Sequence, residues 1–223
     1  MEDRITHHAS CITASKKGIF ISFEGIEGTG KTIQSRLLCE HLMKKGYKVI
    51  LTEEPGGTRI GLKIRDLLLS TENREITPVA ELLLYNASRS QHIKEAILPA
   101  INDSSVVITD RFSDSTVAYQ GFGRRIDLGY IDFIQRIVTE GLKPDITLLL
   151  DLDVETGLMR NKGINKTDRL ELEDVEFHKR VRDGYLEIAE KEPERIKLID
   201  ASGSIEEIHS KVINIVTNLI SSR

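Results

Sequence analysis

Five short, nearly continuous apolar stretches alternate with longer segments of helical periodicity, and this alternation is the strongest constraint on how the chain can fold. The apolar stretches cover residues 18–25, 48–54, 106–110, 145–152 and 195–200. The helical segments cover residues 31–46, 58–70, 78–101, 113–120, 127–141, 174–192 and 204–220. Apolar strands separated by helices are typical of a parallel sheet covered on both faces. We therefore predict one doubly wound α/β domain with a five-stranded parallel sheet over residues 18–223, preceded by a flexible polar tail over residues 1–17.

The sequence GIEGTGKT, between the first strand and the first helix, matches the phosphate-binding P-loop pattern G-x-x-x-x-G-K-[S/T]. Glycines let successive backbone N–H groups turn towards a phosphate, and the helix that starts at Lys31 adds its positive end. We expect Lys31 to be exposed and to reach the β- and γ-phosphates, and Thr32 to take one position on Mg²⁺. The sequence thus predicts a nucleoside triphosphate site formed by Gly25, Ile26, Glu27, Gly28, Thr29, Gly30, Lys31 and Thr32.

Charge and hydropathy disfavour several classes of partner. The 31 Lys and Arg residues are outnumbered by 35 Asp and Glu residues, and the net charge of −4 has the wrong sign for non-specific nucleic-acid binding. No apolar run reaches the ~20 residues that cross a bilayer. The first residues lack the apolar core of a secretory signal, and the two cysteines fit a reducing compartment. We expect a cytoplasmic protein without a nucleic-acid or membrane partner.

Two classes of protein with such a phosphate loop are weighed for this chain, namely a GTPase switch and a kinase. Residues 165–168 match the guanine-reading pattern N-K-x-D, and residues 200–203 match D-x-x-G. In GTPases the two motifs occur in the opposite order, and N-K-x-D follows an apolar strand rather than lying in a basic loop. The order and the context therefore favour the kinase.

A kinase also needs a site for the molecule that receives the phosphoryl group. Asp110 and Arg111 follow the third strand, and ligands of open α/β sheets bind at the carboxyl ends of the strands. A carboxylate there can hold Mg²⁺ through water, and a guanidinium can bind phosphate with two hydrogen bonds. Tyr85 and Arg89 are four residues apart on a predicted helix, so a ring and a hydrogen-bond donor share one face. A surface ion pair and an ordinary helix-surface pair are the alternatives.

Several stretches together resemble the thymidylate kinase family over residues 18–220. They are FEGIEGTGKT, EPGGT, ELLLYNASRSQH, DRFSDSTVAYQG, LDLDVETGLMR and DRLE. The resemblance implies a P-loop kinase with a short lid that transfers the γ-phosphoryl group of ATP to dTMP with Mg²⁺ as cofactor, and it implies a homodimer. A kinase for another nucleoside monophosphate is the alternative within the same class.

The resemblance also implies roles for individual residues. Glu27 stands where the family has an acid that faces the sugar 3′-hydroxyl, and Tyr119 where a ring crowds the 2′ position. Tyr85 stands where a ring stacks on thymine, Arg89 where a guanidinium reads its O4, and Arg111 where the acceptor phosphate is bound. Asp110 is expected close to the metal and to Lys31. The other residues expected around dTMP are Arg65, Ser115, Thr116 and Gln120.

Two positions depart from the usual family pattern. Tyr85 replaces a phenylalanine, which leaves stacking intact but adds a hydroxyl that needs a partner. Glu53, in TEEPGG, replaces an arginine, which removes one cation near the pocket.

The basic segment 160–169 is predicted to be a lid that carries a catalytic arginine. The variable positions of the phosphate loop carry no cation, and charge that develops on the transferred phosphoryl group is commonly stabilised by an arginine. Arg160 and Arg169 flank the segment, and we favour Arg160 because it closes a helix. A merely solvated loop is the alternative.

Other polar residues are assigned no catalytic role. His41, His92 and His178 each stand alone on predicted helices, where a histidine is usually packed or solvated. Asp151 ends a strand and is expected to approach the metal region, whereas Asp153 is expected to cap a helix.

Overall fold

The structure is a computed structural model that describes residues 18–162 and 168–222. The expected tail at 1–17 and residues 163–167 of the expected lid lie outside the described residues. The strands are β1 Ile19–Glu24, β2 Val49–Glu53, β3 Val106–Asp110, β4 Ile146–Asp151 and β5 Ile196–Asp200. The α-helices are α1 Lys31–Lys44, α2 Arg59–Leu69, α3 Pro78–His92, α4 Leu98–Asn102, α5 Ser113–Thr116, α6 Leu128–Thr139, α7 Val154–Lys162, α8 Val175–Lys191 and α9 Ile205–Ser221. Two π-helical segments are η1 Ile93–Ile97 and η2 Val117–Gly123.

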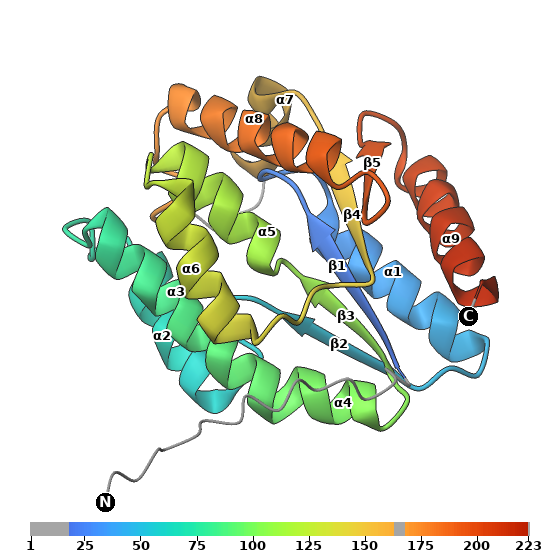
Figure 1. The fold of residues 1–223 in the computed structure, drawn as a ribbon. Coiled ribbons are helices and arrows are strands. Elements are labelled where there is room, and N and C mark those ends of the chain that lie inside the picture. The colour runs from blue at the N-terminus through green and yellow to red at the C-terminus, as the bar shows by residue number, and fades with distance from the viewer. Residues whose placement is uncertain (1–17, 163–167, 223) are drawn as a thin grey trace, which may run out of the picture.

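The five strands form one parallel sheet in the order β2-β3-β1-β4-β5, which confirms the predicted fold (Figure 1). The strand order reverses at β1, which lies between β3 and β4. Phe23 pairs with Asp110 on one side and with Leu148 on the other, so the carboxyl ends of the three central strands lie side by side. This edge, beside the switch in strand order, is where an open α/β sheet binds its ligand.

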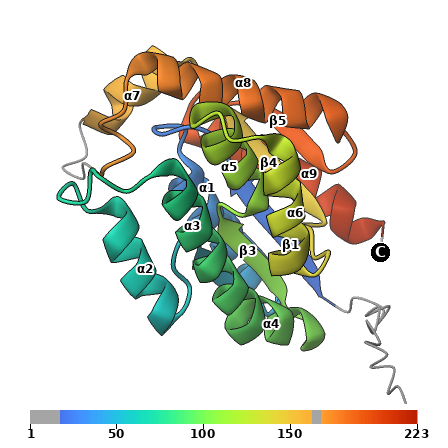
Figure 2. The same ribbon diagram turned by 60° about the vertical axis from the view of Figure 1, so that its left-hand side comes forward.

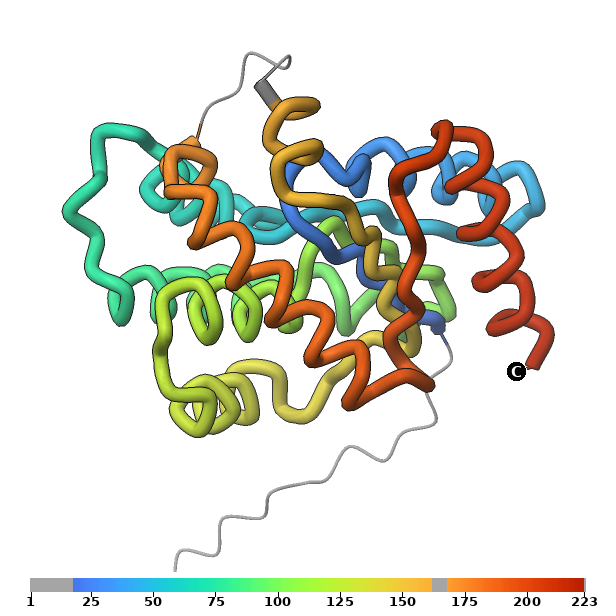
Figure 3. Tube along the Cα trace, turned by 90° about the horizontal axis from the view of Figure 1, so that it is seen from above, coloured from blue at the N-terminus to red at the C-terminus, as the bar shows by residue number. Residues whose placement is uncertain are grey.

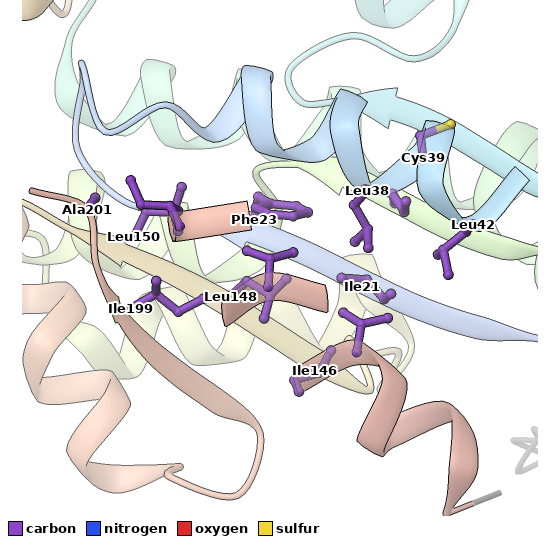
Figure 4. Packing of buried hydrophobic residues seen from close by; sticks show 14 of the residues in the cluster. Ile21, Phe23, Leu38, Cys39, Leu42, Ile146, Leu148, Leu150, Ile199 and Ala201 are labelled. Carbon is purple, nitrogen blue, oxygen red and sulfur yellow. The ribbon is translucent and has the colours of Figure 1, made fainter. Parts of the chain in front are cut away.

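Helices cover both faces of the sheet, as Figures 1 and 2 show. On one face, Leu38 of α1 and Val212 of α9 belong to the same buried cluster as Phe23 and Leu148 (Figure 4). On the other face, Phe20 packs with Ile97 of η1 and with the residues around it. Burial on both faces explains why the strands are apolar without alternation.

The long helix predicted over residues 78–101 is divided into α3, η1 and α4. The π-helical turn at Ile93–Ile97 comes just before Pro99. Proline has no N–H to give and its ring collides with the carbonyl four residues earlier, so the regular helix cannot continue unchanged. The predicted helix 113–120 likewise changes from α5 to η2, and π-helical turns are frequent at functional sites.

The first part of the expected lid is helical, because α7 extends through Lys162. Seen from above in Figure 3, α7 lies beside the chain that follows β1. No helix among the described residues is long and apolar enough to cross a membrane.

Candidate active site at the carboxyl edge of the sheet

The phosphate loop depends on three glycines with positive φ, namely Gly25 at 138°, Gly28 at 74° and Gly30 at 88°. A Cβ on Gly25 would lie 2.3 Å from the carbonyl oxygen of Leu150 in β4. A Cβ on Gly28 would lie 2.0 Å from the carbonyl oxygen of Gly157 in α7. The loop is therefore in backbone contact with the sheet on one side and with the first helix of the lid on the other, and side chains at these two positions would break both contacts.

Lys31 is folded into the loop, so the expectation that it would be exposed is wrong. Its side chain is 7% exposed, and Nζ donates to the carbonyl oxygen of Ile26 at 2.6 Å. Burial, followed by the positive charge of Arg111, lowers the pKa of Lys31 to about 8. The carbonyl of Ile26 satisfies the ammonium within the loop, an interaction that local sequence spacing does not reveal.

Thr32 and Asp110 come together at the mouth of the loop. The Thr32 hydroxyl donates to Oδ2 of Asp110 at 2.5 Å, although the two residues are 78 positions apart in the chain. An exposed hydroxyl next to a carboxylate at the carboxyl end of β3 is an all-oxygen donor pair of the kind that suits Mg²⁺. The described residues contain no group of three or more His, Cys, Asp or Glu that could enclose a metal ion alone. A cation there would have to take its remaining ligands from water or from a substrate.

Arg111 is the centre of the acceptor side of the site. It has a positive φ of 74°, which is uncommon for a residue other than glycine and is frequent at functional sites. Its guanidinium donates hydrogen bonds at 3.0 to 3.3 Å to Gly25 O, Ser115 Oγ, Tyr185 OH, Glu27 Oε1 and Tyr119 OH. It also lies over the ring of Tyr119, with the guanidinium carbon 4.9 Å from the ring centroid. The structure thus brings together four residues predicted for the dTMP site, namely Glu27, Arg111, Ser115 and Tyr119.

Glu24 and Tyr185 belong to this cluster but were not predicted. The carboxylate of Glu24 accepts hydrogen bonds from the backbone N–H of Phe112 at 2.7 Å, Ser115 Oγ at 2.6 Å and Tyr185 OH at 2.8 Å. Burial, and secondarily the charge of Asp114, raises the pKa of Glu24 to about 7. Glu24 directly precedes the P-loop motif, and its position at the end of an apolar strand was the signal that could have identified it.

His178, which was assigned no catalytic role from the sequence, also lies in this cluster. It is fully buried on α8, and its Nδ1 is 3.3 Å from Oε2 of Glu27. Burial alone would raise the pKa of Glu27, but the contact with His178 and the charges of Arg111 and Lys31 outweigh it and hold that pKa below its ordinary value. His178 and Tyr185 are seven residues apart and so share one face of the helix, which was the only local signal.

Arg89 is more deeply buried than a residue that reads a base edge needs to be. Its side chain is 2% exposed and donates to Glu54 Oε2 at 2.7 Å, Thr116 Oγ1 at 2.7 Å and the carbonyl of Phe112 at 2.9 Å. Arg89 is thus a partner for the buried Glu54 carboxylate, and its contact with the edge of a base stays a prediction. Tyr85, one turn earlier on α3, is half-buried against the cluster that contains Ile26 and Tyr119, as a stacking ring beside the loop would be.

The remaining predicted pocket residues lie around this cluster. Thr116 accepts the hydrogen bond from Arg89, and the amide of Gln120 donates to Glu81 Oε1 at 2.8 Å. Arg65 donates to the carbonyl of Pro55 at 2.7 Å, and its guanidinium is 3.4 Å from the carboxylate of Glu53. The glutamate that departs from the family pattern therefore draws Arg65 towards itself.

The two lid arginines are placed very differently. Arg160 is exposed and donates to the carbonyl oxygens of Ala201 at 3.0 Å and Ser202 at 3.4 Å. Arg169 is 5% exposed, and its guanidinium donates to Leu68 O at 3.0 Å and to Glu81 Oε2 at 2.6 Å. Arg169 therefore pairs with a buried carboxylate, whereas Arg160 contacts only neutral carbonyl oxygens.

Two aspartates near the end of β4 behave differently from each other. Asp151 forms a bidentate ion pair with Arg182, with N–O distances of 2.7 and 2.8 Å, so its carboxylate already has a charged partner. Asp153 accepts a hydrogen bond from the backbone N–H of Thr156 at 3.1 Å, which confirms its role at the start of α7.

Comparisons with known proteins agree on one family. A family model described as thymidylate kinase matches residues 23–212. A thymidylate kinase of Geotalea daltonii is 49% identical over 206 residues, which cover 89% of this chain and 96% of that protein. One from Caldanaerobacter subterraneus is 49% identical over 200 residues, which cover 90% and 95% respectively. A crystal structure of thymidylate kinase from Ehrlichia chaffeensis has a TM-score of 0.75 and 37% identity, and it covers 89% of this chain and 98% of that chain.

The agreement extends through most of the chain and through the site itself. The matched region begins at Phe23, just before the phosphate loop, and ends in α9, so it includes the loop, the Arg111 cluster and both described arms of the lid. The two relatives share nearly half of their residues with this chain over almost their whole length. The chain therefore belongs to the thymidylate kinase family, a family of nucleoside monophosphate kinases.

Proposed function

We propose that this protein transfers the γ-phosphoryl group of ATP to dTMP, giving ADP and dTDP. The observation that carries the proposal is the hydrogen bond of 3.0 Å from Arg111 to the carbonyl oxygen of Gly25. It joins the cation expected to bind the acceptor phosphate to the first residue of the loop expected to bind the donor phosphates. Two nucleotides bound at these places would meet with their phosphates at one loop.

The residues present fit a reaction that is catalysed by alignment of the two substrates and neutralisation of their charge. Lys31 and Arg111 supply two cations to the same region, and burial followed by the positive charge of Arg111 lowers the pKa of Lys31. Phosphoryl transfer needs little covalent chemistry from the protein, because alignment of the two substrates and neutralisation of their charge provide most of the catalysis. No covalent enzyme intermediate is required.

Mg²⁺ is the cofactor that this site is built to take. Thr32 Oγ1 and Asp110 Oδ2 are the oxygen donors that would hold it, Asp110 through water. Bound there, the ion would neutralise charge on the donor phosphates.

The acceptor nucleoside would lie between α3 and the Arg111 cluster. In this arrangement the ring of Tyr85 stacks on thymine, Tyr119 crowds the 2′ position of the sugar and Glu27 meets its 3′-hydroxyl. Arg89 contributes N–H groups to the edge of the base only in addition to its bonds with Glu54 and Thr116. Its main contribution is then to hold the wall of the pocket.

Arg160 is the lid arginine that we assign to catalysis. It is three residues after Gly157, whose carbonyl oxygen lies against Gly28 of the phosphate loop. Its present partners are neutral carbonyl oxygens, which a phosphate can replace without stranding a buried charge. Arg169 has less of that freedom, because it is buried and shares the carboxylate of Glu81 with Arg124.

A homodimer and a cytoplasmic location complete the proposal. Val79 and Leu83 of α3 and Tyr130, Phe133 and Ile137 of α6 are each more than half exposed, and the two helices pack against each other. A second copy of the chain would bury this apolar face, since a patch of this kind on a monomer is unusual. Sedimentation equilibrium should give the mass of two chains, and a mass of one chain at micromolar concentration would contradict the dimer.

The decisive experiment is an acid-quenched product analysis with MgATP and a panel of dTMP, dUMP, UMP, dGMP and AMP. The proposal predicts ADP and dTDP in equal amounts, with dTMP as the best acceptor. Free phosphate without a nucleoside diphosphate product from the acceptor would indicate a GTPase-like switch. Equal turnover of dTMP and AMP would indicate a kinase for another or a broader set of monophosphates.

A further inference from the structure

His178 and the loop carboxylate of Glu27 leave a set of buried polar atoms without hydrogen bonds. Oε2 of Glu27 and both ring nitrogens of His178 have no hydrogen-bond partner among the described residues. Nδ1 and Oε2 are 3.3 Å apart, but their geometry is not that of a hydrogen bond. Buried polar atoms are nearly always satisfied, so an unpaired set that includes a carboxylate oxygen of the phosphate loop indicates a polar group that arrives with a ligand.

The other oxygen of Glu27, Oε1, already accepts two hydrogen bonds. Oε2 of Glu27 and Nδ1 of His178 are therefore the atoms left to bind a ligand. Oε1 accepts from Tyr119 OH at 2.5 Å and from Arg111 Nη2 at 3.1 Å. Tyr119 and Arg111 thus hold one side of the carboxylate, and His178 is the group that faces the other side. The rings of Phe177 and His178 form a T-shaped contact, with 5.5 Å between the ring centroids.

We propose that His178 positions Glu27 and that Glu27 Oε2 with His178 Nδ1 forms a receptor for one hydroxyl group, the 3′-hydroxyl of the acceptor nucleotide. A hydroxyl can donate to a carboxylate oxygen and accept from an imidazole N–H at the same time. Two such bonds of ordinary length, about 2.8 Å each, can converge on one oxygen when the two protein atoms are 3.3 Å apart. The inference rests on the proposed acceptor site and adds to it the residue that selects for a sugar with a free 3′-hydroxyl.

The charges around the pair are consistent with this role. Arg111 and Lys31 favour the ionised form of Glu27, while Asp168 and Glu171 are the nearby acids that oppose it. A carboxylate held in its ionised form is an acceptor only, so the donor in the receptor must come from the hydroxyl and from His178.

The test compares dTMP with 3′-deoxythymidine 5′-monophosphate as acceptors. In His178→Phe we expect kcat/KM for dTMP to fall about tenfold or more through KM, because hydrogen bonds that involve a charged group are lost. We expect kcat/KM for the 3′-deoxy nucleotide to change by less than about threefold. His178→Asn, which keeps an N–H near the position of Nδ1, should restore most of the preference for dTMP.

Two further measurements separate positioning from a structural role. In a double-mutant cycle, His178→Phe and Glu27→Gln should be clearly non-additive in kcat/KM for dTMP, because the histidine acts through the carboxylate. His209→Phe, at a histidine on α9 away from the site, is the matched control and should leave the preference unchanged.

Each outcome decides the inference independently of the proposed function. An equal loss for both acceptors in His178→Phe and in His178→Asn, or additive effects with Glu27→Gln, would overturn it. If His178→Phe does not fold, the same comparison is made with His178→Asn and His178→Gln, of which only the first should keep the preference. Failure of the unmodified protein to phosphorylate dTMP would instead overturn the proposed function.

Discussion

The donor and acceptor halves of the site are organised in opposite ways. On the donor side, Lys31 donates to the loop's own carbonyl oxygen at Ile26, and Thr32 donates to Asp110, so the groups expected to hold phosphate and metal are bonded to each other. On the acceptor side, Arg111 and Glu27 lie in a buried network that reaches from the phosphate loop to α8. The donor groups are held only by contacts within the loop and at the end of β3, whereas a larger network fixes the guanidinium of Arg111 and the carboxylate of Glu27 in position. Preorganised charge of the second kind costs little reorganisation during the reaction.

The largest expected effect comes from a substitution on the donor side alone. Lys31→Ala should reduce kcat by at least roughly 10²–10³-fold, because the transferred phosphoryl group loses the cation that neutralises its developing charge. Its free energy of unfolding without nucleotide should fall by no more than about 1 kcal/mol, since the ammonium contacts only oxygens of the loop itself. Lys44→Ala at the end of the same helix is the control. Normal turnover of Lys31→Ala would remove the basis of the whole interpretation.

The second effect distinguishes the two arginines that flank the lid, Arg160 and Arg169. Arg160→Ala should lower kcat by roughly 10³-fold and leave stability unchanged, as expected for an arginine that acts in the transition state. Arg169→Ala should instead lower the free energy of unfolding by about 1.5–3 kcal/mol, because Glu81 loses one charged hydrogen bond but keeps its ion pair with Arg124. Acid-quenched activity assays measure kcat, and urea unfolding measures stability, for both variants. A fall in kcat below tenfold for Arg160→Ala, with KM unchanged, would exclude it as the catalytic arginine.

The third effect tests whether the acceptor side is one unit. Arg111→Lys should reduce kcat/KM for dTMP by roughly 10²-fold, because the charged hydrogen bonds of a planar guanidinium cannot be reproduced by an ammonium. Stability should fall with activity, since Glu27, Tyr119 and Tyr185 lose a shared donor. Arg125→Lys is a matched control, because Arg125 also has a positive φ but is exposed. Loss of activity at full stability would show that the network does not contribute to folding.

The smallest effect is a pH dependence of stability on the acceptor side. The pKa of Glu24 is raised from 4.5 to about 7 in the folded protein, so its contribution is present below pH 4.5 and is lost as the pH rises to 7. At about 1.4 kcal/mol per pH unit, the unfolding free energy should lose up to about 3 kcal/mol over this range. Glu24→Gln should abolish that part of the slope in urea titrations. Parallel curves for the two proteins would mean that the hydrogen-bond donors keep Glu24 ionised throughout.

Features that depend on short sequence separations could be predicted from the sequence. The five strands end within a residue or so of their predicted limits, and the Asp153 cap formed as expected, because apolar periodicity and helix capping are local properties. The phosphate loop was equally readable, since its glycines must adopt positive φ whatever surrounds them. The pattern of motifs in linear order was sufficient to identify the family.

Which polar groups become partners was decided only by the tertiary structure. His178 faces Glu27 and Tyr185 reaches Glu24 across more than 150 residues of sequence, because α8 packs over the carboxyl end of the sheet. Arg169 is buried in an ion pair with Glu81 while Arg160 is exposed, and their places in one basic segment did not reveal this difference. A buried charge is stable only beside a partner, and helix packing rather than local spacing determines which partner is within reach.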